Sequence, residues 1–403
     1  MHLSTKILIG LALGVLVGLL GGPDILPFAK DWIAPFGTLF INMIKMIIVP
    51  VVLASLIVGA SSIGDMKKLG RVGARTMVYY LFTTAIAVSL GLFLATVMNP
   101  GEGLSIPTNA EVKSKVAPPI SSVLVNMVPT NPVQAMANAD MLQIIVFALF
   151  IGIGITLVGQ RAKPVESFFD GLAEVSYKIV GIIMEFAPFG VFALIVPVVA
   201  ANGPKVLIPL ATVILAVYIG CILHALIVYG TAVSVLGRMS PVKFFKGVFP
   251  ASLIAFSTCS SSATLPVNMK CCQENLGVSK EISSFVLPLG ATINMDGTAL
   301  YQGVCALFIA QVYGIDLTMG QMMIIVLTGT LGSIGTAGVP GAGLIMLTLV
   351  LQSVGLPLEG VALIAGIDRV LDMIRTSVNV TGDASATVVI QAAEDRYLDS
   401  IKK

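Results

Sequence analysis

Charged residues are scarce in this sequence. Only 11% of its 403 residues are Asp, Glu, Lys or Arg, and 56% are hydrophobic, whereas soluble domains carry about 25% charged residues. The mean hydropathy is +0.98. The net charge of +2 is small, and no basic run with interleaved aromatic residues occurs, so the composition does not suggest a nucleic-acid partner. The chain is predicted to be a polytopic integral membrane protein whose surroundings are a lipid bilayer.

The residues that most enzymes need are also few. The only histidines are His2 and His224, and the sequence contains no HExxH, GxSxG or GxxxxGK[ST] motif. These absences argue against a hydrolase and against a nucleotide-driven pump. The five cysteines are an odd number without CxxC spacing, and we interpret them as small core residues rather than metal ligands or disulfides.

Long apolar runs dominate the first 240 residues, and short basic segments separate them. The chain begins with a basic and then apolar stretch, which we interpret as a first span rather than a cleaved signal sequence. Lys67–Arg75, Gln160–Lys163 and Arg238–Lys246 carry positive charges that mark the cytoplasmic side, so the N-terminus is expected inside and Asn99–Asn138 outside. The predicted spans, the fifth interrupted at Glu185 to Pro188, are Ile7–Leu20, Phe36–Ala60, Met77–Val97, Met141–Val158, Phe168–Val199 and Val206–Leu236.

Two later apolar segments are split by small and polar residues. Gly247–Val267 contains the hydroxyl-rich run Ser257–Thr264, and Val326–Leu351 contains the glycine-rich run Ser333–Gly343. Irregular backbone at membrane depth needs protein or water around it, and paired interrupted segments point to a binding site between inverted repeats. Each segment is predicted to be a re-entrant hairpin, with a kinked span as the alternative. Between them, Asn294–Thr298 predicts a locally unwound helix.

Gly366–Asp383 places ionisable groups in an apolar setting. Asp368, Asp372, Arg375, Asn379 and Asp383 occur at i, i+4, i+7, i+11 and i+15, so a helix would carry them on one face, within about 80°. Ionisable residues inside a membrane indicate a functional site. The alternative is a solvated helix outside the membrane, but the flanking residues are nearly all apolar or small.

Four motifs in order, SSSATLPV, TINMDGTALY, SIGTAGVPGAG and LDMIRTSVNVTGD, resemble the glutamate transporter family, the dicarboxylate/amino acid:cation symporters. The resemblance covers essentially the whole chain. It implies an all-α integral membrane protein with eight transmembrane helices, two re-entrant hairpins and inverted repeats, assembled as a homotrimer in the plasma (inner) membrane. It also implies a scaffold from residues 1–70 and 120–200, and a transport domain from 71–100 and 201–403 that moves as an elevator.

The resemblance implies a substrate site around the stripe. Arg375 offers a planar fork for a side-chain carboxylate, Asp372 is placed for the substrate ammonium, and Asn379 for the α-carboxylate. An internal Arg375–Asp372 salt bridge is the alternative. The expected substrate residues are Cys259, Ser260, Ser261, Thr298, Val339, Pro340, Gly341, Ala342, Gly343, Asp372, Arg375, Thr376 and Asn379.

Sodium is a hard cation that prefers oxygen ligands, and the resemblance implies three Na⁺ sites. The hydroxyls of Tyr80, Thr83 and Thr84 could equally bond back to their own helix. The first site is expected at Gly290, Asn294, Asn379 and Asp383, the second at Thr292, Ser333, Ile334 and Thr336, and the third at Tyr80, Thr83, Thr84, Asn294 and Asp296.

Two departures from the family pattern affect the function. Archaeal members carry an arginine at the position of Cys259 and excitatory members at that of Met373, whereas here the spare arginine is Arg369. Gln302 replaces a glutamate linked to proton and potassium coupling in excitatory members. We therefore expect not an enzyme but a sodium-coupled symporter of L-aspartate, with L-glutamate possible. The alternatives are a proton-coupled glutamate or dicarboxylate symporter and an anion channel.

Overall fold

The computed structural model describes residues 3–62, 66–104, 125–126, 128–334, 336, 338 and 341–401, and every regular element in these ranges is a helix. Most of the predicted external loop and the predicted site residues Val339 and Pro340 lie outside the described residues. Helix is the expected outcome for apolar runs in lipid, because it pairs backbone groups within one segment.

A first set of helices packs around α8. The helix α3 contacts both α7 and α8, and α1 contacts α8. We call this set, residues 3–62 and 128–206, the apolar group. Its elements are α1 (Leu3–Gly21), η1 (Gly22–Ile25), α2 (Leu26–Phe28), η2 (Ala29–Ile33), α3 (Ala34–Ser62), α6 (Pro132–Ala137), α7 (Met141–Val158), η4 (Gly159–Ala162), α8 (Lys163–Asn202) and η5 (Gly203–Val206).

A second set packs around α14 and α18. We call it, residues 66–104 and 207–401, the polar-core group. Its elements are α4 (Met66–Met98), α9 (Leu207–Leu223), η6 (His224–Tyr229), α10 (Gly230–Val235), α11 (Pro241–Thr258), α12 (Ser261–Lys270), η7 (Cys271–Asn275), α13 (Lys280–Ile293), α14 (Asp296–Val312), α15 (Met319–Ser333), α16 (Ala342–Ser353), η8 (Leu358–Gly360), α17 (Val361–Ala365) and α18 (Asp368–Ile401).

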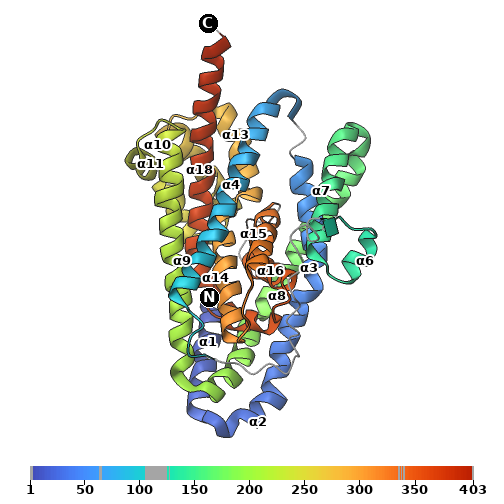
Figure 1. Ribbon diagram of the computed structural model, residues 1–403, viewed down its shortest axis with the longest axis vertical. Coiled ribbons are helices and arrows are strands. Elements are labelled where there is room, and N and C mark those ends of the chain that lie inside the picture. The colour runs from blue at the N-terminus through green and yellow to red at the C-terminus, as the bar shows by residue number, and fades with distance from the viewer. Residues whose placement is uncertain are drawn as a thin grey trace.

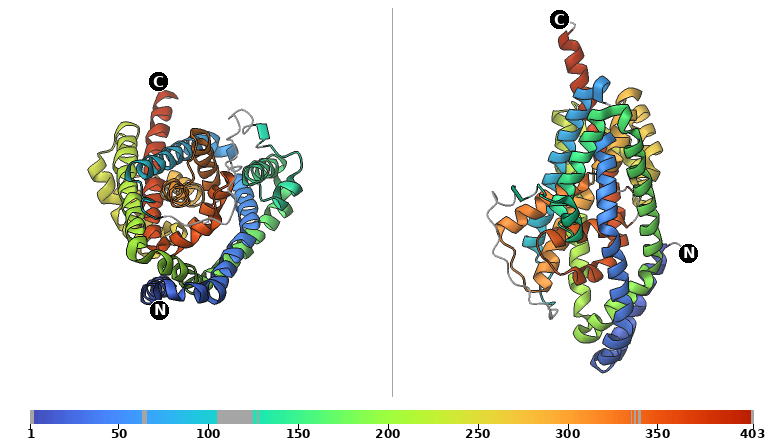
Figure 2. Two further views of the ribbon diagram at one scale, coloured as in Figure 1. Left: turned by 60° about the horizontal axis from the view of Figure 1, so that its bottom comes forward. Right: turned by 90° about the vertical axis from the view of Figure 1, so that its right-hand side faces the viewer.

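The two groups lie side by side. In Figure 1, α14, α15 and α16 occupy the middle, with α4, α9 and α18 on one side and α3 and α7 on the other, and α8 is labelled just below α16. Contacts between the groups run from α13 and α16 to α3, from α15 and α16 to α7, and from α17 to α8. Figure 2 shows the same arrangement from two further directions. The middle of the molecule is therefore enclosed by helices of both groups.

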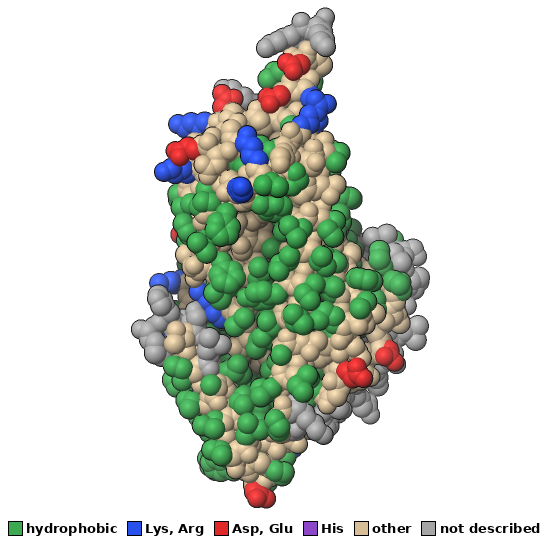
Figure 3. Space-filling view, turned by 90° about the vertical axis from the view of Figure 1, so that its left-hand side faces the viewer, with side chains coloured by type: hydrophobic (Ala, Val, Ile, Leu, Met, Phe, Trp, Pro, Cys, Tyr) green, Lys and Arg blue, Asp and Glu red, His purple; other side chains and the backbone are tan. Residues whose placement is uncertain are grey.

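The outer surface suits a bilayer. Figure 3 shows hydrophobic side chains over most of one face, with charged side chains gathered mainly at the upper end. In the described residues, four stretches are long and apolar enough to cross a membrane: Thr5–Met43, Arg71–Met98, Gln143–Ile183 and Leu207–Val235. Shorter apolar helices include Met319–Ser333 and Ala342–Ser353. The chain is thus a multi-pass membrane protein, and the count of eight spans stays a prediction.

Both interrupted segments fold back on themselves. The helix α11 ends at Thr258 and contacts α12, which begins at Ser261, and α15 contacts α16. Figure 1 shows α15 and α16 side by side. These contacts confirm two helical hairpins and rule out kinked spans.

The predicted interruption of the fifth span at Glu185 to Pro188 is wrong. The helix α8 runs unbroken through Pro188 and Pro197. A proline removes only one backbone donor, and packing against a neighbouring helix allows it inside a membrane helix. Here α1 packs closely, since a Cβ on Gly10 would lie 2.4 Å from the Pro188 carbonyl oxygen. The repeated glycines of α1 therefore allow α8 to pack closely against it.

Candidate functional site

The two hairpin tips meet each other. Cys259 ends α11 with φ +53°, in the left-handed region, and Ser260 then caps α12 by accepting a hydrogen bond from the Ala263 N–H. The Ser260 hydroxyl also donates to the carbonyl of Gly338, in the second tip, at 2.7 Å. The two hairpin tips are thus joined to each other by a hydrogen bond next to α18.

The unwound point predicted between Asn294 and Thr298 is confirmed at its first residues. Asn294 and Met295 have non-helical angles between α13 and α14. The Asn294 amide donates to the Asn379 carbonyl at 3.0 Å and to Asp383 Oδ1 at 2.9 Å, and Gly297 N–H donates to Asn379 Oδ1 at 2.8 Å. The Asn379 side chain on α18 therefore satisfies one backbone N–H next to the break, and the Asn294 side chain ties the break to α18.

A cavity lies between the hairpin tips, the broken helix and α18. Two residues that were not predicted, Met295 and Gly338, line the cavity. Thr336, which was expected at a cation site, also lines it. The predicted substrate residues that line it are Cys259, Ser261, Thr298, Ala342, Gly343, Asp372, Thr376 and Asn379. Residues far apart in the sequence are thus brought together. Ser260 and Gly341 do not line it; Gly341 adopts φ +88° before α16.

Arg375 lies behind the cavity wall, fully buried. Its Nη1 is 2.9 Å from Asp368 Oδ1, and its Nη2 is 3.0 Å from Asp372 Oδ1. The Tyr301 ring centroid lies 4.0 Å from the guanidinium carbon. The internal salt bridge left open by the sequence is therefore present, and Asp368 adds a second carboxylate. Gly343 permits the approach, since a Cβ there would lie 2.8 Å from Nη1.

Several buried polar atoms have no hydrogen-bond partner in the described part of the chain. Among them are Asp372 Oδ2, Arg375 Nε and Asn294 Oδ1. An unmatched buried polar group costs about 1 to 3 kcal/mol, and more when charged. A carboxylate oxygen of this kind can accept from an ammonium, and an amide oxygen can bind a cation. These unpaired atoms therefore fit a charged solute and a hard cation.

The residues expected around the first cation site lie close together. A Cβ on Gly290 would lie 2.4 Å from Asp383 Oδ1 and 2.5 Å from the Tyr80 hydroxyl. Asn294 links Asp383 to the Asn379 carbonyl. The described residues contain no group of three or more His, Cys, Asp or Glu side chains that could hold a metal ion, so any cation here would depend on carbonyl, amide and hydroxyl oxygens as well.

Asp296, expected at the third cation site, is surrounded by donors. Thr84 donates to it at 2.6 Å, Tyr229 at 2.7 Å, and His224 Nε2 lies 3.1 Å away. The Thr83 hydroxyl donates back to the Tyr80 carbonyl at 3.1 Å, and the Thr84 hydroxyl also lies 2.7 Å from that carbonyl, as the simpler interpretation of these hydroxyls expected. The Tyr80 hydroxyl donates to the Val286 carbonyl.

The residues expected at the second cation site come from α13 and the second hairpin. The hydroxyls of Thr292, Ser333 and Thr336 bond to nearby carbonyls of their own segments. Ile334 follows the last residue of α15 with an extended ψ of 118°. Helix ends of this kind leave carbonyl groups without an intrahelical partner.

Besides Met295 and Gly338, which line the cavity, sequence reasoning missed four residues that contact the buried charges. Asp368 was placed on the stripe but given no role, although its spacing of seven from Arg375 puts both on one face. Tyr301, His224 and Tyr229 touch Arg375 or Asp296 from α14 and η6. No sequence pattern connects these residues, because only tertiary packing brings η6 against α14.

Arg369 reaches the first hairpin. Its Nη2 lies 3.5 Å from the Thr258 carbonyl, next to the tip residue Cys259. No ion pair with Asp372 appears among the described residues. Its contact is therefore with the hairpin backbone rather than with the carboxylate beside the cavity.

The fold and the site define a membrane protein with a small, polar-lined cavity between two helical hairpins. The sequence model of the sodium:dicarboxylate symporter family matches residues 3–393, and the chain belongs to this family. It is 39% identical to a proton/sodium-glutamate symport protein of Geobacillus stearothermophilus over 98% of this chain and 95% of the relative. It is also 39% identical to a proton/glutamate-aspartate symporter of Escherichia coli over 98% and 93%. An excitatory amino acid transporter of Caenorhabditis elegans is 37% identical over 96% and 87%. The protein is a transporter and not an enzyme.

Proposed function

We propose that this protein is a secondary active symporter that carries an acidic amino acid together with sodium ions. The observation that carries the proposal is the buried Arg375, paired with Asp368 and Asp372 behind a cavity where Asp372 Oδ2 has no partner. Relatives named as glutamate or glutamate-aspartate symporters support the same substrate class.

The charges explain which solute fits. Asp368, Asp372 and Arg375 sum to one negative charge. The substrate's side-chain carboxylate would replace Asp372 at Arg375 Nη2, which leaves Asp372 for the substrate ammonium, while Asp368 keeps holding the guanidinium. Asn379 would contact the α-carboxylate of the substrate, and Thr298 would contact its side-chain carboxylate. A dicarboxylate without an amine would leave Asp372 facing an acidic group, so this alternative is disfavoured.

Coupling to cations follows from the same sum. With an acidic amino acid bound, the chamber would hold two net negative charges, which is unfavourable in a buried site unless cations enter with it. The three proposed Na⁺ sites use the residues given above, and Asn294, Asn379 and Asp383 link the first of them to the substrate chamber. Relatives whose names include protons support proton coupling as a second candidate.

Uptake into proteoliposomes decides between the two cations. We expect radiolabelled aspartate to accumulate when the only gradient is inward sodium, with protons equilibrated by an ionophore. If accumulation depends on a proton gradient and not on sodium, the co-transported cation is the proton rather than sodium. Saturable, electrogenic uptake would separate a carrier from an anion channel.

L-aspartate is proposed as the preferred substrate. One methylene changes affinity by only about 1 to 3 kcal/mol, so glutamate is expected to bind more weakly rather than not at all. Competition by unlabelled aspartate and glutamate in the sodium-driven assay tests this point. A preference for glutamate would mean that the chamber is longer than proposed.

Division of the helices into the apolar and polar-core groups supports an elevator mechanism, in which the polar-core group moves as a transport domain against a scaffold. The proposed scaffold is residues 1–70 and 120–200, and the proposed transport domain is 71–100 and 201–403. We further propose a homotrimer in the plasma membrane with the N-terminus in the cytoplasm. Cross-linking and mass measurement of the purified protein test the trimer.

A further inference from the structure

Aromatic side chains form an exposed stripe where α1 turns into α3. Phe28, Trp32 and Phe36 are 57%, 69% and 64% exposed. They lie four residues apart along an uninterrupted helical run through α2, η2 and the start of α3, so they share one face. Large aromatic residues are usually buried, and three of them exposed in register need a partner.

The other face of this turn is held by the apolar group. Ala29 is completely buried, and η1, α2 and η2 all contact α8, with η2 also against α3. The backbone of the turn is therefore fixed by packing. The aromatic stripe faces away from the molecule and is not free to fold into the core.

The turn lies at one end of the membrane-spanning part. The helical run Thr5–Met43 has 39 residues, which at about 1.5 Å per residue is nearly twice the roughly 30 Å hydrocarbon thickness. Figure 1 shows that the chain reverses at α2, at the end of the molecule opposite to the C-terminus. Two apolar helices thus leave the hydrocarbon here.

Charged residues lie before and between the first two rings. Asp24, Lys30 and Asp31 are exposed in the same turn. Interleaved rings and charges are typical of the membrane interface, where the rings reach the acyl boundary and the charges stay in water. The centre of a protein–protein interface is instead depleted in charge, so a lipid surface fits this stripe better than a second copy of the chain.

We infer that Phe28, Trp32 and Phe36 form an interfacial anchor whose partner is the head-group and upper acyl region of the bilayer. This inference concerns the apolar group and is independent of the transported solute. The chain offers a direct probe, because Trp32 is its only tryptophan.

The test uses the full-length protein in phosphatidylcholine vesicles containing lipids brominated near the head group or near the chain end. We expect Trp32 emission to be quenched at least twofold more strongly by the shallow bromines, and to be poorly quenched by aqueous iodide. Trp32→Phe provides the blank. Strong iodide quenching without lipid quenching would place the ring in water, and no quenching by any of the three would place it in a protein contact; either result overturns the inference.

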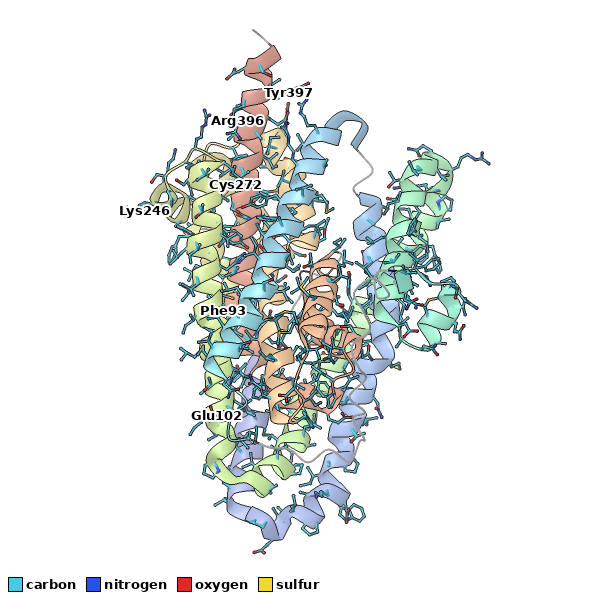
Figure 4. All side chains as sticks on the ribbon, viewed as in Figure 1. Phe93, Glu102, Lys246, Cys272, Arg396 and Tyr397 are labelled. Atoms are coloured by element: carbon cyan, nitrogen blue, oxygen red, sulfur yellow. The ribbon has the colours of Figure 1, made fainter. Side chains whose placement is uncertain are left out.

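A matched pair of variants tests the whole stripe. Phe28→Ser combined with Phe36→Ser should raise iodide quenching of Trp32 severalfold, because the neighbouring rings no longer hold the turn in the interface. Phe93→Ser removes an equally exposed ring on α4, at 62% exposure, shown in Figure 4, and should leave Trp32 unchanged. Equal effects of the two changes, or no effect of either, would contradict the anchor.

Discussion

The apolar group and the polar-core group place their polar side chains differently. Among the described residues, the only polar or charged side chains buried in the apolar group are Ser61 and Ser176, whereas the polar-core group buries Arg375 and several aspartates. Large hydrophobic side chains are exposed in both groups, along α1, α3 and α8 and along α4, α9 and α11. Both groups therefore suit contact with lipid, but only the polar-core group also surrounds a cluster of buried charges.

The largest effect is expected where the polar core is most charged. Arg375→Ala should abolish acidic amino acid uptake, because losing one member of a buried charged pair costs about 2 to 5 kcal/mol, or roughly tens to thousands of times in affinity. Binding by calorimetry checks this, with folding monitored by gel filtration. Arg369→Ala is the control, since Arg369 contacts the hairpin backbone at 3.5 Å; it should lower affinity for aspartate and glutamate only modestly and in similar proportion. Wild-type affinity in Arg375→Ala would refute the assignment.

Adding a single methyl group at Gly290 tests whether Asp383 binds the cation. Gly290→Ala would force a Cβ within 2.4 Å of Asp383 Oδ1, so the carboxylate must move. We expect the sodium concentration for half-maximal uptake to rise at least tenfold. Gly297 lies equally close to the Arg375 backbone, so Gly297→Ala serves as the comparison and should disturb substrate affinity first. Unchanged sodium dependence in Gly290→Ala would separate Asp383 from the cation.

In the apolar group, a substitution should lower stability without changing substrate affinity. Gly14→Val would collide with Ile195 on α8, because even a Cβ would lie 2.3 Å from its Cγ2. Overpacking of this kind costs about 1 to 3 kcal/mol. The expected outcome is a lower melting temperature in detergent with unchanged aspartate affinity in the folded fraction, whereas Gly154→Val, where no atom lies within 4 Å of a Cβ, should change neither.

The smallest effect is expected at the charged end of the molecule, where α4 meets the end of α18. Arg71 and Arg75 both bond Glu394, at 2.9 and 2.8 Å from its Oε1, and Arg71 stacks on Tyr397, which Figure 4 shows near the C-terminal end. The hydrogen bond from Arg71 keeps the pKa of Glu394 below its usual range, with added attraction from both arginines.

A lowered pKa means that this carboxylate stabilises the fold above its unfolded pKa of about 4.3, and that the contribution is lost as the pH falls through the lower folded pKa. Glu394→Gln should therefore lower the melting temperature slightly at neutral pH and not at all in stronger acid, and the difference should shrink in high salt. A difference that persists in acid would point to packing rather than charge.

The sequence predicted most of the polar core because its residues occur in contiguous, unusual segments. The stripe from Asp368 to Asp383, the break at Asn294 and the two hairpin tips all interrupt apolar surroundings, and charge at membrane depth stands out there. Asp368 as a partner of Arg375 could have been predicted from helical spacing. The contacts of Tyr301, His224 and Tyr229 could not, since they depend on how α14 and η6 pack. The continuous α8 was missed because a proline predicts a break unless a partner helix such as α1 supports it.

We propose that substrate and sodium bind to one linked site in the polar-core group. Calorimetric titration of aspartate at several sodium concentrations tests it most directly. We expect aspartate affinity to rise steeply with sodium, sodium affinity to rise with aspartate by the same factor, and Asp383→Asn to weaken both. An aspartate affinity that is the same at every sodium concentration would contradict it.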